Sequence, residues 1–247
     1  SDRLYKSEAP LLITMGLFFC LQFFGVYLCG MGNRLFVSAR NESPKMFENK
    51  FLDFFSRIHF LSVPILFVPI TGYFIYRSAV EFEVNLLLLA GLLFGGYFFW
   101  TLMEYCIHRF FFHKEFTTPL GKKIHYIAHG IHHDYPNDSM RLVMPPAINL
   151  SLAVLFYWMF YAVLQDKGLT AGFFAGFVFG YMVYDLMHFA SHFYNFKNAW
   201  FQRVKRSHLL HHYREPNSGY GLSTIFWDRV FGTTHPDSAR VEVPSSK

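Results

Sequence analysis

Charge is what this chain of 247 residues has least of. Only 16% of its residues are Asp, Glu, Lys or Arg, whereas soluble domains carry about 25%. This shortage excludes an ordinary soluble domain. The net charge is +5, but the basic residues are scattered along loops beside apolar runs and form no single stripe. We therefore expect no nucleic-acid partner.

Cysteine is almost as scarce. The chain has three cysteines, Cys20, Cys29 and Cys106, and all of them lie inside apolar runs. An odd number of cysteines in such places excludes a disulfide framework and a thiolate metal site. We interpret all three as small apolar side chains.

Apolar runs, by contrast, are long and frequent. A helix that crosses a bilayer core of about 30 Å needs roughly 20 apolar residues, and five runs approach this length: 11–31, 58–76, 86–107, 147–164 and 169–193. Aromatic residues make up 21% of the chain, which fits lipid-facing helices and interfacial belts. We predict an all-α integral membrane protein with four to five transmembrane helices, of which the first could instead be a shallow anchor. Gly172, Gly176 and Gly180 in the last run predict a closely packed neighbouring helix.

The segments between these runs define two sides of the membrane. Short turns at 77–85 and 165–168 face one side, and the longer polar segments 33–57, 114–145 and 194–247 face the other. The second side holds most of the Lys and Arg, so the positive-inside rule places it in the cytosol. There we expect a histidine-rich helical cap, with an amphipathic helix within 46–55 lying on the membrane surface.

Ten of the 13 histidines form four clusters on that side. Two HxxHH units occur, and on a helix the three histidines of each unit share one face. We therefore predict that each unit is one metal-binding site and that the chain binds two metals. His188 and His192 (i, i+4) also share a face. His108 and His113 (i, i+5) do not align on an ideal helix, which suits a helix end or ligands to different metals. The ten candidate ligands are His108, His113, His129, His132, His133, His188, His192, His208, His211 and His212.

The remaining histidines are His59, His125 and His235, and we predict structural roles for all three, although His125 could join the cluster at 129–133. Neutral imidazole is a good ligand for Zn, Cu, Fe and Ni. A structural zinc site is closed, four-coordinate and usually contains cysteine, so ten histidines are too many for one. Two metals with about five imidazoles each would leave room for an exogenous ligand, and iron there could activate dioxygen.

Several sequence blocks carry a resemblance to a known family. They are EYCIHRFFFH at 104–113, HGIHH at 129–133, RLVMPP at 141–146, YDLMH at 184–188 and GYGLST at 219–224, with WD at 227–228 and FGT at 231–233. From about residue 47 to residue 236 the chain resembles the fatty acid hydroxylase superfamily, and more narrowly the fatty acid 2-hydroxylases. The RLVMPP block and the tail distinguish this branch from sterol desaturases and carotenoid hydroxylases.

The resemblance implies a non-haem di-iron enzyme that hydroxylates the 2-position of a fatty acyl chain, free or lipid-linked as in ceramide and other sphingolipids, with O2. Its two iron ions would bind the ten clustered histidines, and zinc could replace them in purified protein. Together with the pattern of apolar runs, it predicts a domain organisation: an N-terminal membrane segment (1–32), an interfacial segment (33–57), a catalytic domain (58–236) and a tail (237–247). These 247 residues contain no cytochrome b5 segment, so we expect a separate electron-transfer protein, cytochrome b5-like or ferredoxin-like, or a donor domain outside this sequence. We expect the bacterial cytoplasmic membrane, or the endoplasmic reticulum membrane in a eukaryote.

Two carboxylates precede candidate ligands by about one helical turn. Asp185 lies three residues before His188 and Glu104 lies four before His108. Each could hydrogen-bond a ligand imidazole, as carboxylates around metal sites do, or be a helix-end charge near water. For Asp228, and for Asp138 with Arg141, we predict roles in the fold.

Two other functions compete with acyl 2-hydroxylation. One is a sterol or lipid desaturase or oxidase of the same superfamily. The other is not an enzyme but a membrane metal carrier or a metal-stabilised scaffold, which would place histidines or carboxylates along a path inside the spans.

Overall fold

Helices are the regular elements of this protein throughout the part that the structure, a computed structural model, describes, residues 35–236. The predicted span at 11–31 and the tail at 237–247 lie outside these residues. Four helical stretches are long and apolar enough to cross a membrane: Ser62–Glu81, Leu86–Phe112, Pro146–Leu164 and Lys167–Phe193. The predicted all-α fold with four spans is therefore confirmed.

These spans are built from four α-helices, two of which continue into a turn of π-helix. They are α3 (Ser62–Tyr76) with η1 (Arg77–Glu81), α4 (Leu86–Ile107) with η2 (His108–Phe112), α7 (Pro146–Leu164) and α8 (Lys167–Phe193). The remaining elements are short: α2 (Lys50–Phe55), α5 (Pro119–His125), η3 (Tyr126–Gly130), α6 (Ile131–Asp134), α9 (Ala199–Tyr213) and α10 (Phe226–Val230).

The second predicted span differs from the observed helix at both ends. Residues 58–61 precede α3, because the amide of Ile58 donates to the carbonyl of Met140 (2.6 Å) and ties this segment to the cap. Pro64 then falls in the first turn of α3, where its missing N–H costs nothing. At the other end, the helix continues as η1 into the predicted turn.

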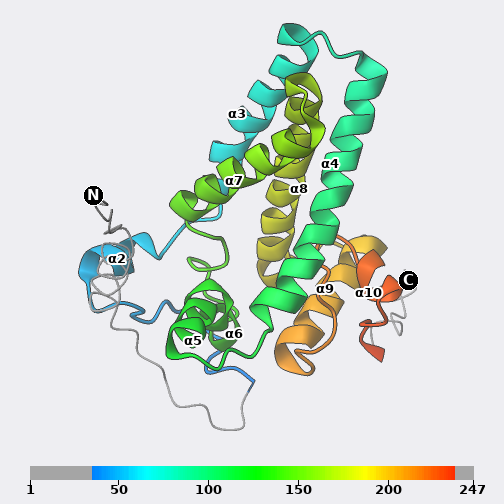
Figure 1. Cartoon of the computed structure of the whole chain (residues 1–247). Coiled ribbons are helices and arrows are strands. Elements are labelled where there is room, and N and C mark those ends of the chain that lie inside the picture. Colours follow the sequence, from blue (N-terminus) through cyan, green and yellow to red (C-terminus); the bar gives the residue numbers. More distant parts are fainter. Residues whose placement is uncertain (1–34, 237–247) are drawn as a thin grey trace, which may run out of the picture.

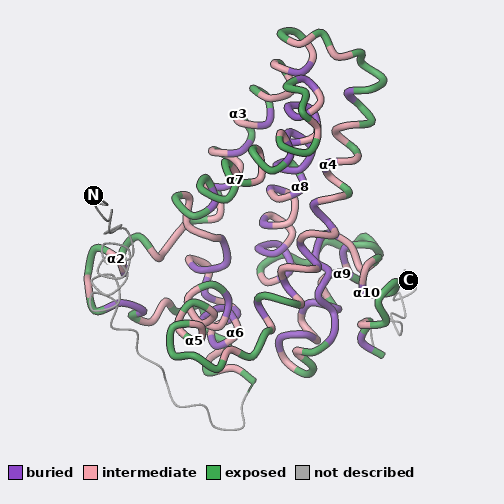
Figure 2. The backbone as a smooth tube through the Cα atoms, in the orientation of Figure 1, coloured by how far each residue is buried: buried purple, intermediate pink, exposed green. Residues whose placement is uncertain are grey.

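Helix α8 is the centre of the bundle. It packs against α3, α4 and α7 (Figure 1), and 61% of its apolar window is buried, compared with 11–22% for the other three spans. Figure 2 shows the same contrast along the tubes. The predicted close approach is real, since a Cβ on Gly176 would lie 2.1 Å from the carbonyl oxygen of Leu93 in α4.

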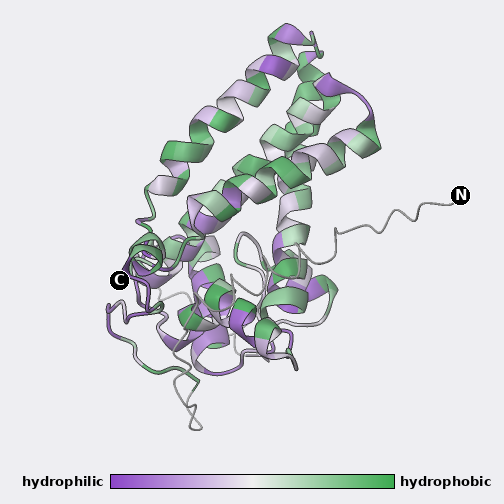
Figure 3. Cartoon of the chain, turned by 60° about the vertical axis from the view of Figure 1, so that its left-hand side comes forward, coloured by the Kyte–Doolittle hydropathy of each residue, from purple (hydrophilic) through white to green (hydrophobic). Residues whose placement is uncertain are grey.

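The short helices form a cap at the end of the bundle where α4 and α8 finish, and this end is the more hydrophilic (Figures 1 and 3). The surface helix expected within 46–55 is α2, whose Phe51 and Phe54 are exposed. Asp53 anchors it, because its carboxylate accepts from the amide of Met46 (2.7 Å) and pairs with Arg57 (2.7 Å).

Candidate metal centre

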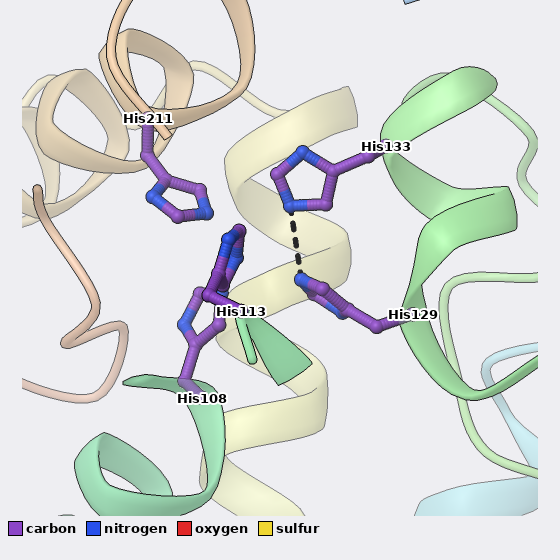
Figure 4. A group of neighbouring side chains, drawn as sticks. All are labelled: His108, His113, His129, His133 and His211. Atoms are coloured by element: carbon purple, nitrogen blue, oxygen red, sulfur yellow. Dashed lines mark hydrogen bonds between the residues drawn. The ribbon is translucent and has the colours of Figure 1, made fainter. Parts of the chain in front are cut away.

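The structure brings all ten clustered histidines together where α4 and α8 enter the cap. They form two groups of five, and within each group the candidate ligand atoms lie within 4.8 Å of one another. The first group is His108, His113, His129, His133 and His211, and the second is His132, His188, His192, His208 and His212. Figure 4 shows the first group, whose rings come from η2 and the residue after it, from 129–133 in the cap, and from α9, and point toward one another.

The prediction that the three histidines of each HxxHH unit bind the same metal is wrong. His208 and His212 belong to the second group, but His211 belongs to the first, and the unit at 129–133 divides in the same way. The reason is helical geometry. Residues i and i+4 are about 40° apart around the axis, whereas i+3 is about 100° from i+4 on the other side. Each unit therefore offers a pair of rings to one group and a single ring to the other.

His108 and His113 belong to the same group, which decides between the two alternatives for their i, i+5 spacing. The amide of His113 donates to the carbonyl of His108 (3.1 Å) and closes the π turn η2. A π turn holds more residues than an α turn, so side chains five apart come onto one side. Their ring centroids are 5.0 Å apart.

The arrangement of ring nitrogens fits metal ions. In three pairs the Nε2 atoms lie 2.7–2.9 Å apart: His129 with His133, His132 with His188, and His192 with His208. Two ligands at right angles on a metal with bonds of about 2.1 Å would be about 3 Å apart.

Several ring nitrogens are also buried without a hydrogen-bond partner. In the first group these include Nε2 of His108, His113 and His211, and in the second both ring nitrogens of His212. Buried polar atoms are rarely left unpaired. Since each of these rings offers one nitrogen to its group, a bound metal ion in each group is the partner that fits.

Burial also keeps these imidazoles neutral. It lowers the pKa of His113 to about 3, with a further contribution from the neighbouring His108. Burial and the surrounding rings likewise hold the pKa of His133 and His212 well below 6.5. Near pH 7 these rings are therefore unprotonated and keep a lone pair for a metal.

Two backbone carbonyls orient rings of the first group. Nδ1 of His108 lies 2.7 Å from the carbonyl oxygen of Tyr220, and Nδ1 of His211 lies 2.8 Å from that of Ser218. A carbonyl oxygen only accepts, so both Nδ1 atoms carry the proton and both Nε2 atoms face the group with a lone pair. No role at the site was predicted for this loop from its sequence, although its GYGLST block was the available signal.

Glu104 holds that same loop. Its carboxylate accepts from the amides of Leu222 (2.5 Å) and Ser223 (2.8 Å) and from the hydroxyl of Ser223. Asp228 braces the loop from the other side by accepting from the amides of Tyr220 (2.9 Å) and Gly221 (2.8 Å). The structural role predicted for Asp228 is confirmed, as is the pairing of Asp138 with Arg141 (3.6 Å).

Asp185 accepts a hydrogen bond from the hydroxyl of Tyr181, which in turn accepts from the side-chain amide of Asn149 (2.5 Å). Glu104 and Asp185 are both buried, with 3% exposure, so the interpretation as helix-end charges near water is wrong. Within residues 35–236, neither carboxylate hydrogen-bonds a histidine. Instead, Glu104 holds the loop at Leu222 and Ser223, and Asp185 holds the side chain of Tyr181.

The three other histidines lie outside both groups. Nε2 of His125 is within hydrogen-bonding distance of the carbonyl of Phe112, and so holds the segment after η2. His59 is exposed and accepts from the amide of Leu61 (3.3 Å), while His235 is buried.

A cavity of about 910 Å³ adjoins the histidines. Its wall is mostly apolar and comes from α2, α4, α7 and α8, with Phe55, Trp100 and Phe177 among its residues. His129 of the first group and His132 and His188 of the second also line it. The volume is at the upper end of what ligand pockets usually have.

Comparisons with known proteins agree with this geometry. The model of the fatty acid hydroxylase family matches residues 93–233, which include all ten clustered histidines. The chain belongs to the fatty acid hydroxylase family. Among its relatives, it is 34% identical over 196 residues to the dihydroceramide fatty acyl 2-hydroxylase FAH2 of Arabidopsis thaliana, covering 78% of this chain and 80% of that protein.

A yeast relative is more similar in sequence but longer. This family member is 39% identical over 199 residues to the ceramide very long chain fatty acid hydroxylase scs7 of Schizosaccharomyces pombe, covering 78% of this chain and 56% of that protein. A solved structure of full-length scs7p, in which only the hydroxylase domain is visible, superposes with a TM-score of 0.71 at 35% identity, covering 77% of this chain and 72% of that one. The chain thus spans about half the length of the S. pombe relative.

Proposed function

We propose that this family member is a non-haem di-iron enzyme that hydroxylates the 2-position of a fatty acyl chain, free or lipid-linked as in a ceramide. The observation that carries the proposal is the apolar cavity whose wall includes histidines of both groups. An acyl chain in that cavity would meet the metal centre directly. The names of the relatives, a dihydroceramide acyl 2-hydroxylase and a ceramide fatty acid hydroxylase, support this substrate class.

The cavity residues have two tasks. The apolar side chains bind the acyl chain and exclude water, and burial of each methylene contributes about 0.8 kcal/mol. The few polar groups orient its carboxyl or amide end. Tyr184 lines the cavity with its ring 5.9 Å from that of His188, and no described residue hydrogen-bonds its hydroxyl. That hydroxyl is therefore available to donate to the acyl carbonyl and place the adjacent carbon beside the histidines.

The histidines would hold the metal, and neutral imidazole is a ligand that suits iron. When bound, iron supplies dioxygen activation. The chain contributes position, neutral ligands and a dry apolar surrounding. Zinc lies above Fe(II) in the usual affinity order, so purified protein could carry zinc instead.

The excess of Lys and Arg around the cap supports a cytosolic metal centre. We propose the bacterial cytoplasmic membrane as the location, or the endoplasmic reticulum membrane if the source is a eukaryote. Electrons would come from a separate cytochrome b5-like or ferredoxin-like protein.

Mass spectrometry of lipids from cells supplied with labelled dioxygen tests the function. Cells that express the chain should gain one labelled oxygen at the acyl 2-position, and the His132→Ala variant should lose it. His59→Ala is the matched control, because His59 is exposed and lies outside both groups. An alkene or an oxidised sterol in place of the 2-hydroxy acyl product would contradict the proposal and favour the desaturase or oxidase alternative.

The carrier alternative has less support. In the four described spans, Asp and Glu side chains occur at the cap end, as Glu104 and Asp185, and at the opposite end, as Glu81. They form no ionisable path across the bundle, which metal transport would require.

A further inference from the structure

One outer face of the cap is strongly basic. Residues 194–214 contain five cations and no Asp or Glu: Lys197, Arg203, Lys205, Arg206 and Arg214. Arg203, Arg206 and Arg214 are exposed. The segment that contains α9 is therefore basic along its whole length.

A groove of about 400 Å³ lies on this face. Lys205, Arg206 and Arg214 line it together with the apolar side chains of Leu209, Leu210 and Tyr213. An apolar floor framed by charged groups is the usual anatomy of a protein-binding surface.

The same helix carries metal-centre histidines on its opposite side. His208, His211 and His212 of α9 are buried, with 0–1% exposure. Tyr213 connects the two sides, since its ring centroid lies 6.4 Å from that of His212. A protein seated in the groove would be separated from the second histidine group by the thickness of one helix, about 10 Å.

The proposed reaction needs a partner at such a place. Insertion of one atom of O2 into a C–H bond, with release of the other as water, consumes two electrons and two protons beyond those of the substrate. A donor protein must deliver these electrons close to the iron ions.

We propose that this α9 face, the groove with Lys205, Arg206, Leu209, Leu210, Tyr213 and Arg214, is the docking surface for an acidic one-electron carrier protein. The inference rests on the proposed function. Charge complementarity selects the partner, because cations around the groove would steer an acidic protein and set its orientation.

A lipid surface is the competing occupant, and it fits the groove less well. The exposed aromatic residues Phe196 and Trp200 stand at the start of α9, directly after the end of α8, where a membrane interface would be. Of the groove residues only Gln202 lies within one turn of Trp200, and the others extend from Lys205 to Arg214, roughly one and a half to four turns further along the helix.

The test reverses charge on the groove and, separately, on another exposed site. Arg206→Glu/Arg214→Glu alters the groove, whereas Lys45→Glu/Lys50→Glu makes the same change of net charge at exposed residues near α2. Lys205 is kept because its Nζ donates to the carbonyl of Tyr194 at the end of α8 (2.5 Å). The probes are the soluble haem domain of a cytochrome b5 and a plant-type ferredoxin, both acidic.

Two measurements are made on the full chain in lipid nanodiscs. The first is equilibrium binding of each oxidised probe to metal-free protein at low and high salt. The second is the rate at which the iron-loaded protein oxidises each reduced probe. For comparison, the product yield is measured in a single turnover in which dithionite supplies the electrons.

The groove variant should bind at least one probe about tenfold or more weakly, lose the salt dependence of binding, and oxidise that probe correspondingly more slowly. Its dithionite-driven product yield should stay within twofold of the wild type, as should every value of the control variant. Equal loss of probe-driven and dithionite-driven turnover would mean that this face is structural and would overturn the proposal.

Three further results would also overturn it. The wild-type protein could bind neither probe, or the control variant could lose as much probe binding as the groove variant. The groove variant could also keep probe binding and lose only its binding to anionic lipid vesicles. The last would assign the face to lipid. Failure of the proposed function looks different, because wild-type protein would then bind and oxidise the probe but give no 2-hydroxy acyl product with dithionite.

Discussion

At the scale of single residues, the division of each HxxHH unit between two groups is the feature with the clearest consequence. His211→Ala and His212→Ala should each lower iron content toward about one ion per chain, but from different groups. The iron that remains should therefore have different Mössbauer parameters in the two variants. Identical spectra would mean that His211 and His212 bind the same metal ion.

Tyr184→Phe tests how the reacting carbon is chosen. Loss of the hydroxyl of this cavity-lining residue should leave iron content unchanged. It should lower the share of product hydroxylated at the 2-position and increase oxidation at neighbouring carbons, because the acyl chain can then shift along the cavity. Product positions are measured by gas chromatography and mass spectrometry. Tyr157→Phe, at a half-buried tyrosine of α7 outside the cavity wall, is the control. Unchanged product positions in Tyr184→Phe would remove this tyrosine from substrate positioning.

Asp53 makes the attachment of α2 sensitive to acid. Burial alone would raise the pKa of its carboxyl, but hydrogen bonds from the amides of Met46 and Phe47 and the charges of Arg57 and Arg141 outweigh it, so the pKa lies below 3.8. A carboxyl with a lowered pKa stabilises the fold above its unfolded pKa, and this contribution is lost as the pH falls through the folded value.

Asp53→Asn should therefore increase hydrogen exchange at residues 46–56 near pH 7, and the difference from wild type should shrink below pH 3.8. Rates are corrected for the intrinsic effect of pH on exchange. A difference that stays constant down to pH 2.5 would show that the charge of Asp53 does not stabilise this segment.

At the scale of elements, the contact between α4 and α8 sets the position of the histidines that follow. Gly176→Ala would place a methyl group 2.1 Å from the carbonyl oxygen of Leu93, and both are backbone-bound, so the helices must separate. We expect a loss of about 1–3 kcal/mol in unfolding free energy and a lower metal content, measured in mixed micelles.

Gly91→Ala in α4 is the matched control, because nothing lies within 4 Å of its added Cβ. Alanine is the better helix former by about 1 kcal/mol, so this variant should be neutral or more stable. Equal destabilisation by both substitutions would mean that the close contact between Gly176 and Leu93 is not the cause.

At the scale of the whole molecule, the four spans put the cap and the 77–85 turn at opposite ends of the bundle (Figure 1). In a chain without its native cysteines, a single cysteine at exposed Lys122 should react with an impermeant maleimide from the cytosol, and one at exposed Glu83 from the other side. Labelling of both positions from one side would contradict the four-span arrangement.

The sequence by itself determined the class of the protein. Low charge and long apolar runs require membrane helices, since a backbone in lipid must satisfy its own hydrogen bonds. The histidine clusters predicted the candidate ligands. Together with their neighbouring blocks they also predicted the family, and the comparisons confirm the family. Local periodicity also predicted the close helix contact at Gly176, because only small residues permit it.

Only the tertiary structure decided how the histidines are shared. Spacing along one helix gives the angles between rings, but which ring meets which partner depends on where the other helices stand. Nδ1 of His108 meets the carbonyl of Tyr220, and Glu104 holds the amide of Leu222, across more than 100 residues of sequence. Such contacts form when α4, α8 and α9 pack together, so no local pattern could predict them.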